Sequence, residues 1–256
     1  MNDFFSRSEA LLGADVMLAL ESKRVLLVGV GGVGSWCAEA LIRTGLRHLT
    51  MVDGDVVQDS NINRQLPATR ETIGKPKVIA LQDRLKQINP DADIKAVYGF
   101  YAKDGQTDSE TDLCLDCYDY IIDAIDSVAA KADLIVCASR VRGAKVYSSM
   151  GAALRFDPTK VTTGELMSIQ GDALAKAVRA RMKRLGLKPS RKIRCVYSEE
   201  QAYKGTMDKG QWTKEDGQGT KDDGQAIKGS LMQVTAVFGC TLASMVVEDI
   251  RKSIVY

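Results

Sequence analysis

The 256-residue sequence predicts an α/β fold, in which a doubly wound, mostly parallel sheet carries helices on both faces. Three observations support this class. Residues 24–28 form a short apolar run, as expected of a strand buried on both faces. A glycine-rich turn follows, and residues 35–43 then show a helical pattern that ends near Gly45. Strand, glycine turn and helix in this order form the first unit of a Rossmann-like fold.

The remaining elements alternate in the same way. Further strands are predicted at residues 49–52, 93–98, 118–122 and 145–149, and further helices at 78–88 and 127–140. Beyond residue 150 we expect a C-terminal extension with strands and a long helix over 230–254, whose apolar stretch is interrupted by Gly239. Residues 203–228 are rich in Lys, Asp, Gly and Gln, which predicts a mobile loop. We therefore expect a single domain over 1–256, with a core at 1–150 and a C-terminal portion at 151–256.

The glycine turn predicts a nucleotide site. Gly29, Gly31 and Gly34 would provide a tight turn, close approach to phosphates and close helix–strand packing, and Gly32 lies in the same loop. The N-terminus of the following helix offers free N–H groups to an anion. Asp53, at the carboxyl end of the second strand, can accept hydrogen bonds from ribose hydroxyls. These features fit NAD and ATP equally well.

A polar segment after the second strand favours ATP. It carries Arg64 between the amides of Asn61, Asn63 and Gln65. Arginine can bind a phosphate through two hydrogen bonds, and amides can donate to neighbouring oxygens. Lys77 stands at the start of the helix that follows. Two basic side chains and a helix terminus suit a triphosphate, whereas hydride transfer has no use for them.

Three further aspartates lie near predicted strand ends. Asp55 fits either a role in the nucleotide site or a turn or cap. Asp123 and Asp126 lie at the carboxyl end of the strand at 118–122, beside the glycine turn in a doubly wound sheet. Asp126 could bind a divalent cation, or it could cap the helix that starts near Ser127.

These motifs, in this order and at this spacing, resemble the ThiF-type adenylating superfamily of ubiquitin-activating enzymes and of molybdopterin-synthase and thiamine-synthesis adenylyltransferases. Within it, the chain is similar to the tRNA threonylcarbamoyladenosine dehydratases. That similarity rests on Phe5-Ser-Arg7, Val-Gly-Gly-Val-Gly-Ser-Trp36, Asp123-Ala-Ile-Asp-Ser-Val128 with Lys131, Asp157-Pro-Thr159 and Val196-Tyr-Ser-Glu-Glu200. It extends from about Phe5 to Ser198 and resumes at Lys228-Gly-Ser230.

The resemblance implies ATP-dependent dehydration of threonylcarbamoyladenosine next to the anticodon of tRNA, through adenylation of the threonyl carboxylate. It assigns Arg64 and Lys77 to the β- and γ-phosphates, and Asp53 to the ribose. Asn61 and Gln65 would orient the phosphates, and Asp126 would hold Mg²⁺.

The resemblance also implies a homodimer, in which Arg7 reaches the ATP of the partner subunit, and the C-terminal portion would then contribute to substrate and dimer contacts. A monovalent cation near the end of the sheet would fit the subfamily, but no residue places it. The sequence identifies no sulfur-relay protein partner.

Charge is distributed unevenly, although the formal net charge is only +2. Residues 174–194 contain nine Lys or Arg and no acidic residue, so the rest of the chain is acidic overall. A basic helix on an acidic protein fits contact with the tRNA backbone, for which the candidates are Lys176, Arg179, Lys183 and Arg184. A solvated helical face is the alternative.

Cysteine usage and hydropathy bear on the location of the protein and on zinc binding. Six cysteines without a signal peptide favour a cytoplasmic protein, and the charges after the C-terminal apolar run favour packing over membrane insertion. Cys114-x-x-Cys117 is a single pair, whereas zinc-binding members of the superfamily carry two, so no structural zinc is expected. Two alternative functions remain: adenylation of the C-terminal glycine of a sulfur-carrier protein, and NAD-dependent oxidoreduction.

Overall fold

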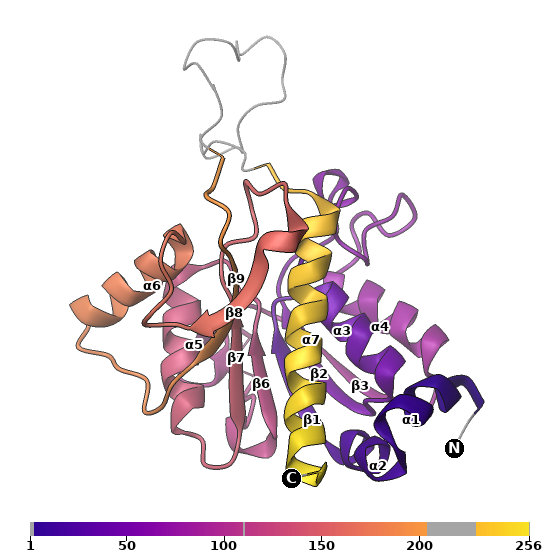
Figure 1. Cartoon of the computed structure of the whole chain (residues 1–256). Coiled ribbons are helices and arrows are strands. Elements are labelled where there is room, and N and C mark those ends of the chain that lie inside the picture. Colours follow the sequence, from indigo (N-terminus) through magenta and orange to yellow (C-terminus); the bar gives the residue numbers. More distant parts are fainter. Residues whose placement is uncertain (1–2, 110, 204–228, 256) are drawn as a thin grey trace.

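A seven-stranded sheet forms the centre of the computed structural model, which describes residues 3–109, 111–203 and 229–255 (Figure 1). The strand order is β3-β2-β1-β6-β7-β9-β8. All neighbouring strands are parallel except β8, which pairs antiparallel with β9 at the edge. The strands are β1 (Arg24–Val28), β2 (His48–Asp53), β3 (Asp93–Tyr98), β6 (Tyr120–Asp123), β7 (Lys145–Ser149), β8 (Val161–Glu165) and β9 (Arg194–Ser198). A separate hairpin joins β4 (Tyr101–Lys103) to β5 (Gln106–Thr107).

Helices cover both faces of this sheet. They are α1 (Ser6–Leu12), α2 (Ala14–Ser22), α3 (Gly34–Thr44), α4 (Lys77–Ile88), α5 (Val128–Arg140), α6 (Ala173–Arg184) and α7 (Met232–Val255). In β1, Val25 and Leu27 belong to a core shared with α2, α3, α4 and α7. Leu26 and Val28 belong to a second core shared with α5 and α6. The apolar run at β1 is thus buried on both faces, and the predicted doubly wound α/β class is confirmed.

The long C-terminal helix is confirmed, since α7 runs continuously through Gly239 from Met232 to Val255. A Cβ at Gly239 would lie 2.4 Å from the Val33 carbonyl oxygen and 2.8 Å from the Cys37 nitrogen. The glycine therefore permits α7 to pack closely on α3. By length and composition α7 alone among the described helices could cross a membrane, yet half of its apolar window is buried in this fold.

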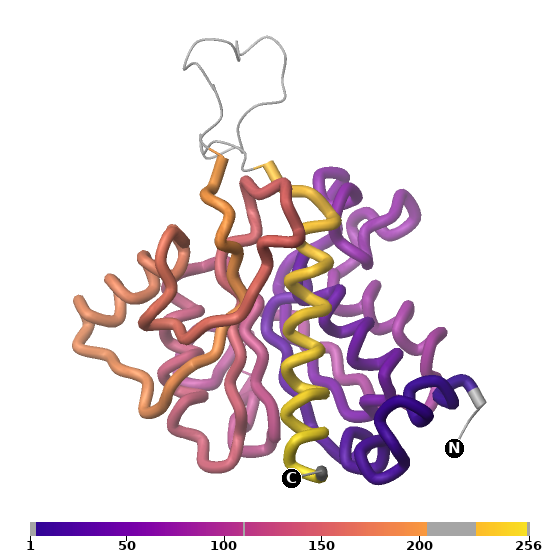
Figure 2. The backbone as a smooth tube through the Cα atoms, in the orientation of Figure 1, coloured from indigo at the N-terminus to yellow at the C-terminus, as the bar shows by residue number. Residues whose placement is uncertain are grey.

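The C-terminal portion extends the sheet and closes the fold. It supplies β8, β9, α6 and α7; β9 continues the parallel sheet beyond β7, and β8 adds an antiparallel edge. Figure 2 shows the N-terminal helices and the last turn of α7 at the same end of the molecule. Of the loop expected at 203–228, only Tyr203 lies among the described residues; its N–H donates to the Leu154 carbonyl.

Candidate active site

Steric contacts explain why the turn between β1 and α3 needs glycine. Gly29 has a φ of +91°, and a Cβ there would lie 2.6 Å from the Ala124 carbonyl oxygen. A Cβ at Gly34 would lie 1.9 Å from the Gly29 carbonyl oxygen. Any side chain at either position would force the turn apart. The turn leads directly into α3, so the N-terminus of that helix opens at the carboxyl end of β1.

The structure brings segment 61–65 onto the same turn. A Cβ at Gly31 would lie 3.8 Å from Gln65 Nε2, and one at Gly32 would lie 3.4 Å from Arg64 Cγ. Trp36 of α3 donates from Nε1 to the Arg64 carbonyl at 3.1 Å. Gln65 is buried, and its Oε1 has no hydrogen-bond partner among the described residues. The structure therefore brings the glycine turn and segment 61–65 together.

Hydrogen bonds within the segment hold Arg64 in place. Its Nη1 donates to the Ser60 carbonyl at 2.8 Å and to Asn63 Oδ1 at 2.9 Å. Burial lowers the pKa of the Arg64 guanidinium. Asn63 Nδ2 donates in turn to the Ser230 carbonyl, just before α7. Asn61 is buried, and its Oδ1 accepts from the Gln58 N–H. Here both asparagines support the segment that presents Arg64.

Lys77 and two aspartates form the adjoining charged group. Lys77 Nζ lies 2.6 Å from Asp55 Oδ2, and the Lys77 N–H donates to the Asp55 carbonyl. Asp55 thus forms an ion pair with Lys77 rather than capping a helix. Asp53 Oδ2 accepts from the Val30 N–H of the glycine turn at 2.8 Å, and its Oδ1 accepts from the Asp55 N–H. Burial raises the pKa of Asp53, while Lys77 and these N–H groups act against that rise.

The two aspartates after β6 have different surroundings. Asp123 is fully buried and pairs with Lys131 of α5 at 2.7 Å. Asp126 is exposed, and no described residue forms a hydrogen bond or ion pair with it. The alternative in which Asp126 caps α5 is wrong, because Ser127 occupies the N-cap position. Its loop contacts the glycine turn through Ala124, and a free carboxylate on that loop fits a hard cation such as Mg²⁺.

An aromatic-rimmed cavity that the motif reasoning missed lies beside Asp53. Its volume is about 370 Å³, and it opens at the carboxyl ends of β2 and β3. Tyr98 and Phe100 are each about half exposed at its rim. A cavity with aromatic walls beside the Asp53 carboxylate suits a nucleobase. In the sequence, the aromatic residues on each side of Gly99 were the signal that could have indicated this cavity. The lining comprises Gly54, Tyr98, Gly99, Phe100, Asp108 and Ser109.

Arg7 lies away from this site within its own chain. It is exposed on α1, and the neighbouring Phe5 packs near Gly45 at the far end of α3. An 11-residue helix such as α3 is ~16 Å long, so Arg7 is separated from the glycine turn by about that length. The single chain therefore does not bring Arg7 to the nucleotide site.

The basic helix α6 packs on α5, on the face of the sheet opposite α3 and α7. Lys176, Lys183 and Arg184 are exposed. Arg179 is partly buried and donates to the Leu166 carbonyl at 2.8 Å, so it also anchors α6 to the chain after β8. Three of the four predicted tRNA-contacting residues are thus free to meet a partner.

Hydrogen bonds of loop 150–157 link the start of α6 to residues 229–230, which contact the segment that carries Arg64. Asp172 caps α6 by accepting from the Ala175 N–H, and it also accepts from the Gly151 N–H. Arg155 is buried with Nη2 3.7 Å from Asp172 Oδ2. Leu154, at a φ of +60°, donates its N–H to the Gly229 carbonyl, next to the Ser230 that holds Asn63. Sequence reasoning did not identify these contacts, since they join distant residues.

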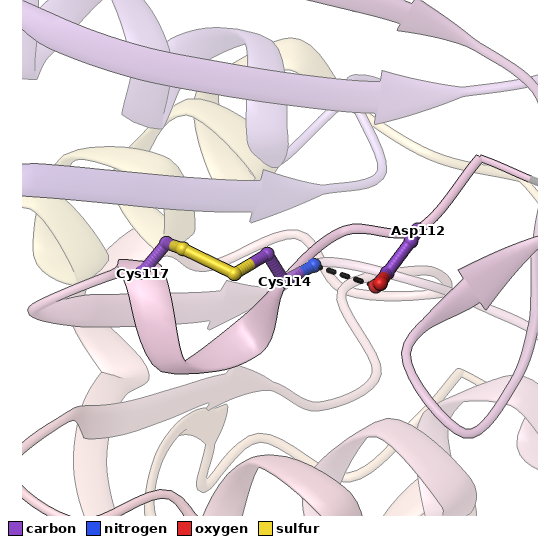
Figure 3. Close-up of a disulfide and its surroundings, with 3 residues drawn as sticks. All are labelled: Asp112, Cys114 and Cys117. Atoms are coloured by element: carbon purple, nitrogen blue, oxygen red, sulfur yellow. Dashed lines mark hydrogen bonds between the residues drawn. A yellow bond between two sulfur atoms is a disulfide. The ribbon is translucent and has the colours of Figure 1, made fainter.

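The cysteine pair lies outside the site. Cys114 and Cys117 form a disulfide, and the Cys114 N–H donates to Asp112 Oδ1 at 2.8 Å (Figure 3). The pair precedes β6, whereas the glycine turn and Asp126 follow strands at their carboxyl ends. In a disulfide neither sulfur is the thiolate that binds zinc.

The fold and these groups together define a nucleotide-binding α/β protein, in which an arginine and a lysine supplement the glycine turn. The chain belongs to the ThiF family, whose model matches residues 5–253. Among its relatives, the tRNA threonylcarbamoyladenosine dehydratase of Haemophilus influenzae is 34% identical over 93% of this chain and 89% of the relative. That of Bacillus subtilis is 36% identical over 77% of this chain and 74% of the relative.

Solved structures agree over nearly the whole chain. The tRNA N6-threonylcarbamoyladenosine dehydratase of E. coli in complex with ATP is 29% identical, with a TM-score of 0.80. That match covers 98% of this chain and 94% of the other. The complex of the same protein with AMP has a TM-score of 0.81 at 30% identity, and covers 98% and 96% of the two chains.

Proposed function

We propose that this chain uses ATP to cyclise threonylcarbamoyladenosine in tRNA, next to the anticodon. The observation that carries the proposal is a pair of cations near the glycine turn. Arg64 lies against the turn, and Lys77 lies near Asp53, whose carboxylate accepts a hydrogen bond from the turn. Similarity to a dehydratase solved with ATP, over almost the full length of both chains, supports it. An NAD-dependent oxidoreductase would leave this pair of cations without a role.

In the proposed reaction, an oxygen of the threonyl carboxylate attacks the α-phosphorus of ATP, and pyrophosphate leaves. The carbamoyl group of the same nucleoside then attacks the activated carboxyl carbon and AMP leaves, so one molecule of water is lost overall. Asp53 would hold the ribose and the aromatic-rimmed cavity the adenine. Arg64 and Lys77 would offset the charge that develops on pyrophosphate. Mg²⁺ held by Asp126 would neutralise further phosphate charge.

The assembly and substrate contacts form a finer part of the proposal. Because Arg7 is exposed and far from its own glycine turn, its role in the ATP site requires a homodimer. Lys176, Lys183 and Arg184 would contact the tRNA backbone, with Arg179 holding their helix in place. A tRNA substrate also implies a cytoplasmic enzyme.

The test is incubation of the protein with ATP, Mg²⁺ and threonylcarbamoylated tRNA, followed by mass spectrometry of the modified nucleoside. We expect the mass to fall by one water, with one AMP released for each nucleoside converted. An unchanged nucleoside, from protein that binds ATP, would contradict the proposal. AMP transfer to the C-terminal glycine of a sulfur-carrier protein would favour the second function. Thermal stabilisation by NAD but not by ATP would exclude both.

A further inference from the structure

A buried ionic network lies next to the proposed ATP site. Lys131 and Asp123 are both fully buried, and Lys131 Nζ lies 2.7 Å from Asp123 Oδ2. Ser148 of β7 donates from Oγ to the same carboxylate oxygen at 2.6 Å. Lys131 Nζ also donates to the Ser149 carbonyl at 2.8 Å. Nothing in the adenylation chemistry requires a charge pair at this depth, and burying one is costly.

The network closes the loop that carries Asp126. Asp123 ends β6, and Lys131 lies in the first turn of α5, with its N–H bonded to the Ser127 carbonyl. The ion pair therefore joins the two ends of loop 124–127. Two donors bond to Asp123 Oδ2, and its Oδ1 accepts the Ile125 N–H at 3.0 Å, inside the loop.

The other side of this loop rests on the glycine turn. The Ala124 N–H donates to the Val28 carbonyl at 2.8 Å. The Ala124 carbonyl oxygen would lie only 2.6 Å from a Cβ at Gly29, so the two segments are in close contact. Ile125, the next residue, is held by Asp123. Asp126 is thus the first residue of the loop with no hydrogen bond or ion pair to the described residues, and its two predecessors are both anchored.

We propose that Asp123, Lys131 and Ser148 are positioning residues, which hold loop 124–127 so that the Asp126 carboxylate meets the cation of Mg²⁺–ATP. This inference rests on the proposed use of ATP. It assigns none of the three to direct contact with substrate. A purely structural role, in which the network only joins β6, β7 and α5, is the rival explanation.

Two neighbouring serines provide a matched pair of variants. Ser148 and Ser149 are both buried in β7, but only the Ser148 hydroxyl contacts Asp123; the Ser149 hydroxyl donates to the Met150 carbonyl. The experiment measures the ATP dissociation constant of Ser148→Ala, Ser149→Ala and wild type by calorimetry, with and without Mg²⁺. Urea unfolding of each variant measures stability separately.

We expect Ser148→Ala to reduce the gain in ATP affinity from Mg²⁺ about fivefold, the scale of one lost hydrogen bond. Ser149→Ala should keep the full gain, even if the two variants lose similar stability. Equal gains in both variants would overturn the positioning role. If wild type binds no ATP at all, the proposed function fails instead.

A second variant tests the charge pair itself. Lys131→Met alone would leave Asp123 buried without a partner, so it is combined with Asp123→Asn, which removes both charges together. We expect the double variant to fold, to bind ATP without Mg²⁺ and to lose most of the gain from Mg²⁺. A folded double variant with the wild-type gain would also refute the proposal.

Discussion

Replacing Lys77 with methionine should separate ligand binding from stability. The Lys77 side chain is only 7% exposed, whereas that of its partner Asp55 is 53% exposed. Methionine can fill the space of the buried aliphatic chain, and water can solvate the carboxylate left behind. We therefore expect Lys77→Met to lower the free energy of unfolding by no more than ~1 kcal/mol, as for an exposed ion pair. Loss of its charge from the triphosphate should lower turnover ~10²–10³-fold.

Lys131 provides the contrasting case in the same protein. The side chains of Lys131 and its partner Asp123 are both 0% exposed, so Lys131→Met leaves the Asp123 charge buried where water cannot reach it. The expected loss of stability is about 3–5 kcal/mol. The two variants thus make the same substitution in ion pairs of nearly equal length, 2.6 and 2.7 Å, and differ in the solvation of the aspartate.

Urea unfolding and single-turnover formation of AMP measure the two effects. Near-normal turnover of Lys77→Met would show that Lys77 does not meet the triphosphate. A stability loss as large as that of Lys131→Met would show that solvent does not compensate Asp55, and would refute the argument from exposure.

Four further predictions concern other parts of the molecule. Arg64→Ala should reduce turnover at least ~10²-fold in the AMP assay, and a smaller effect would place the triphosphate elsewhere. Gly239→Ala should lower the melting temperature clearly, because the new Cβ would lie 2.4 Å from the Val33 carbonyl oxygen; an unchanged value would contradict the close α3–α7 contact. Replacing Lys176, Lys183 and Arg184 together by alanine should weaken tRNA binding and its salt dependence but leave ATP binding intact, as filter binding and calorimetry would show. Burial alone would raise the pKa of Glu39, yet hydrogen bonds from Arg84 and Arg43 lower it below its ordinary value of 4.5. The stability that Glu39 contributes is therefore present above that pH and lost as pH falls further, so the difference in unfolding free energy between wild type and Glu39→Gln should shrink in acid; a constant difference would contradict this.

Much of the fold could be predicted because its signals are local. The apolar run of β1, the glycine turn and the start of α3 are consecutive, and β3 and β7 have the predicted bounds. Each pattern reflects burial or backbone geometry that neighbouring residues impose. The role of Gly239 could not be predicted, because it depends on a contact between two helices. Glycine disfavours a helix locally, but here contact with α3 outweighs that preference.

The site was predictable in its residue types but not in its pairings. Arg64, Lys77 and Asp53 could be chosen because phosphate and ribose need such groups. Their partners could not be chosen, since Asn63 meets the Ser230 carbonyl 167 residues away. The aromatic-rimmed cavity likewise depends on two strands ending side by side.

Residue types in the sequence were enough to predict a nucleotide at the carboxyl end of the first strand, and to favour ATP over NAD. Backbone geometry at the glycine turn and the chemistry of phosphate recognition act through the residue types present in a short stretch. The three-dimensional packing was needed to show that Lys77 pairs with a solvated aspartate, that Lys131 pairs with a buried one, and that Asp126 has no partner among the described residues. The energy of each charge depends on its burial and its neighbours, and both are set when distant segments pack together.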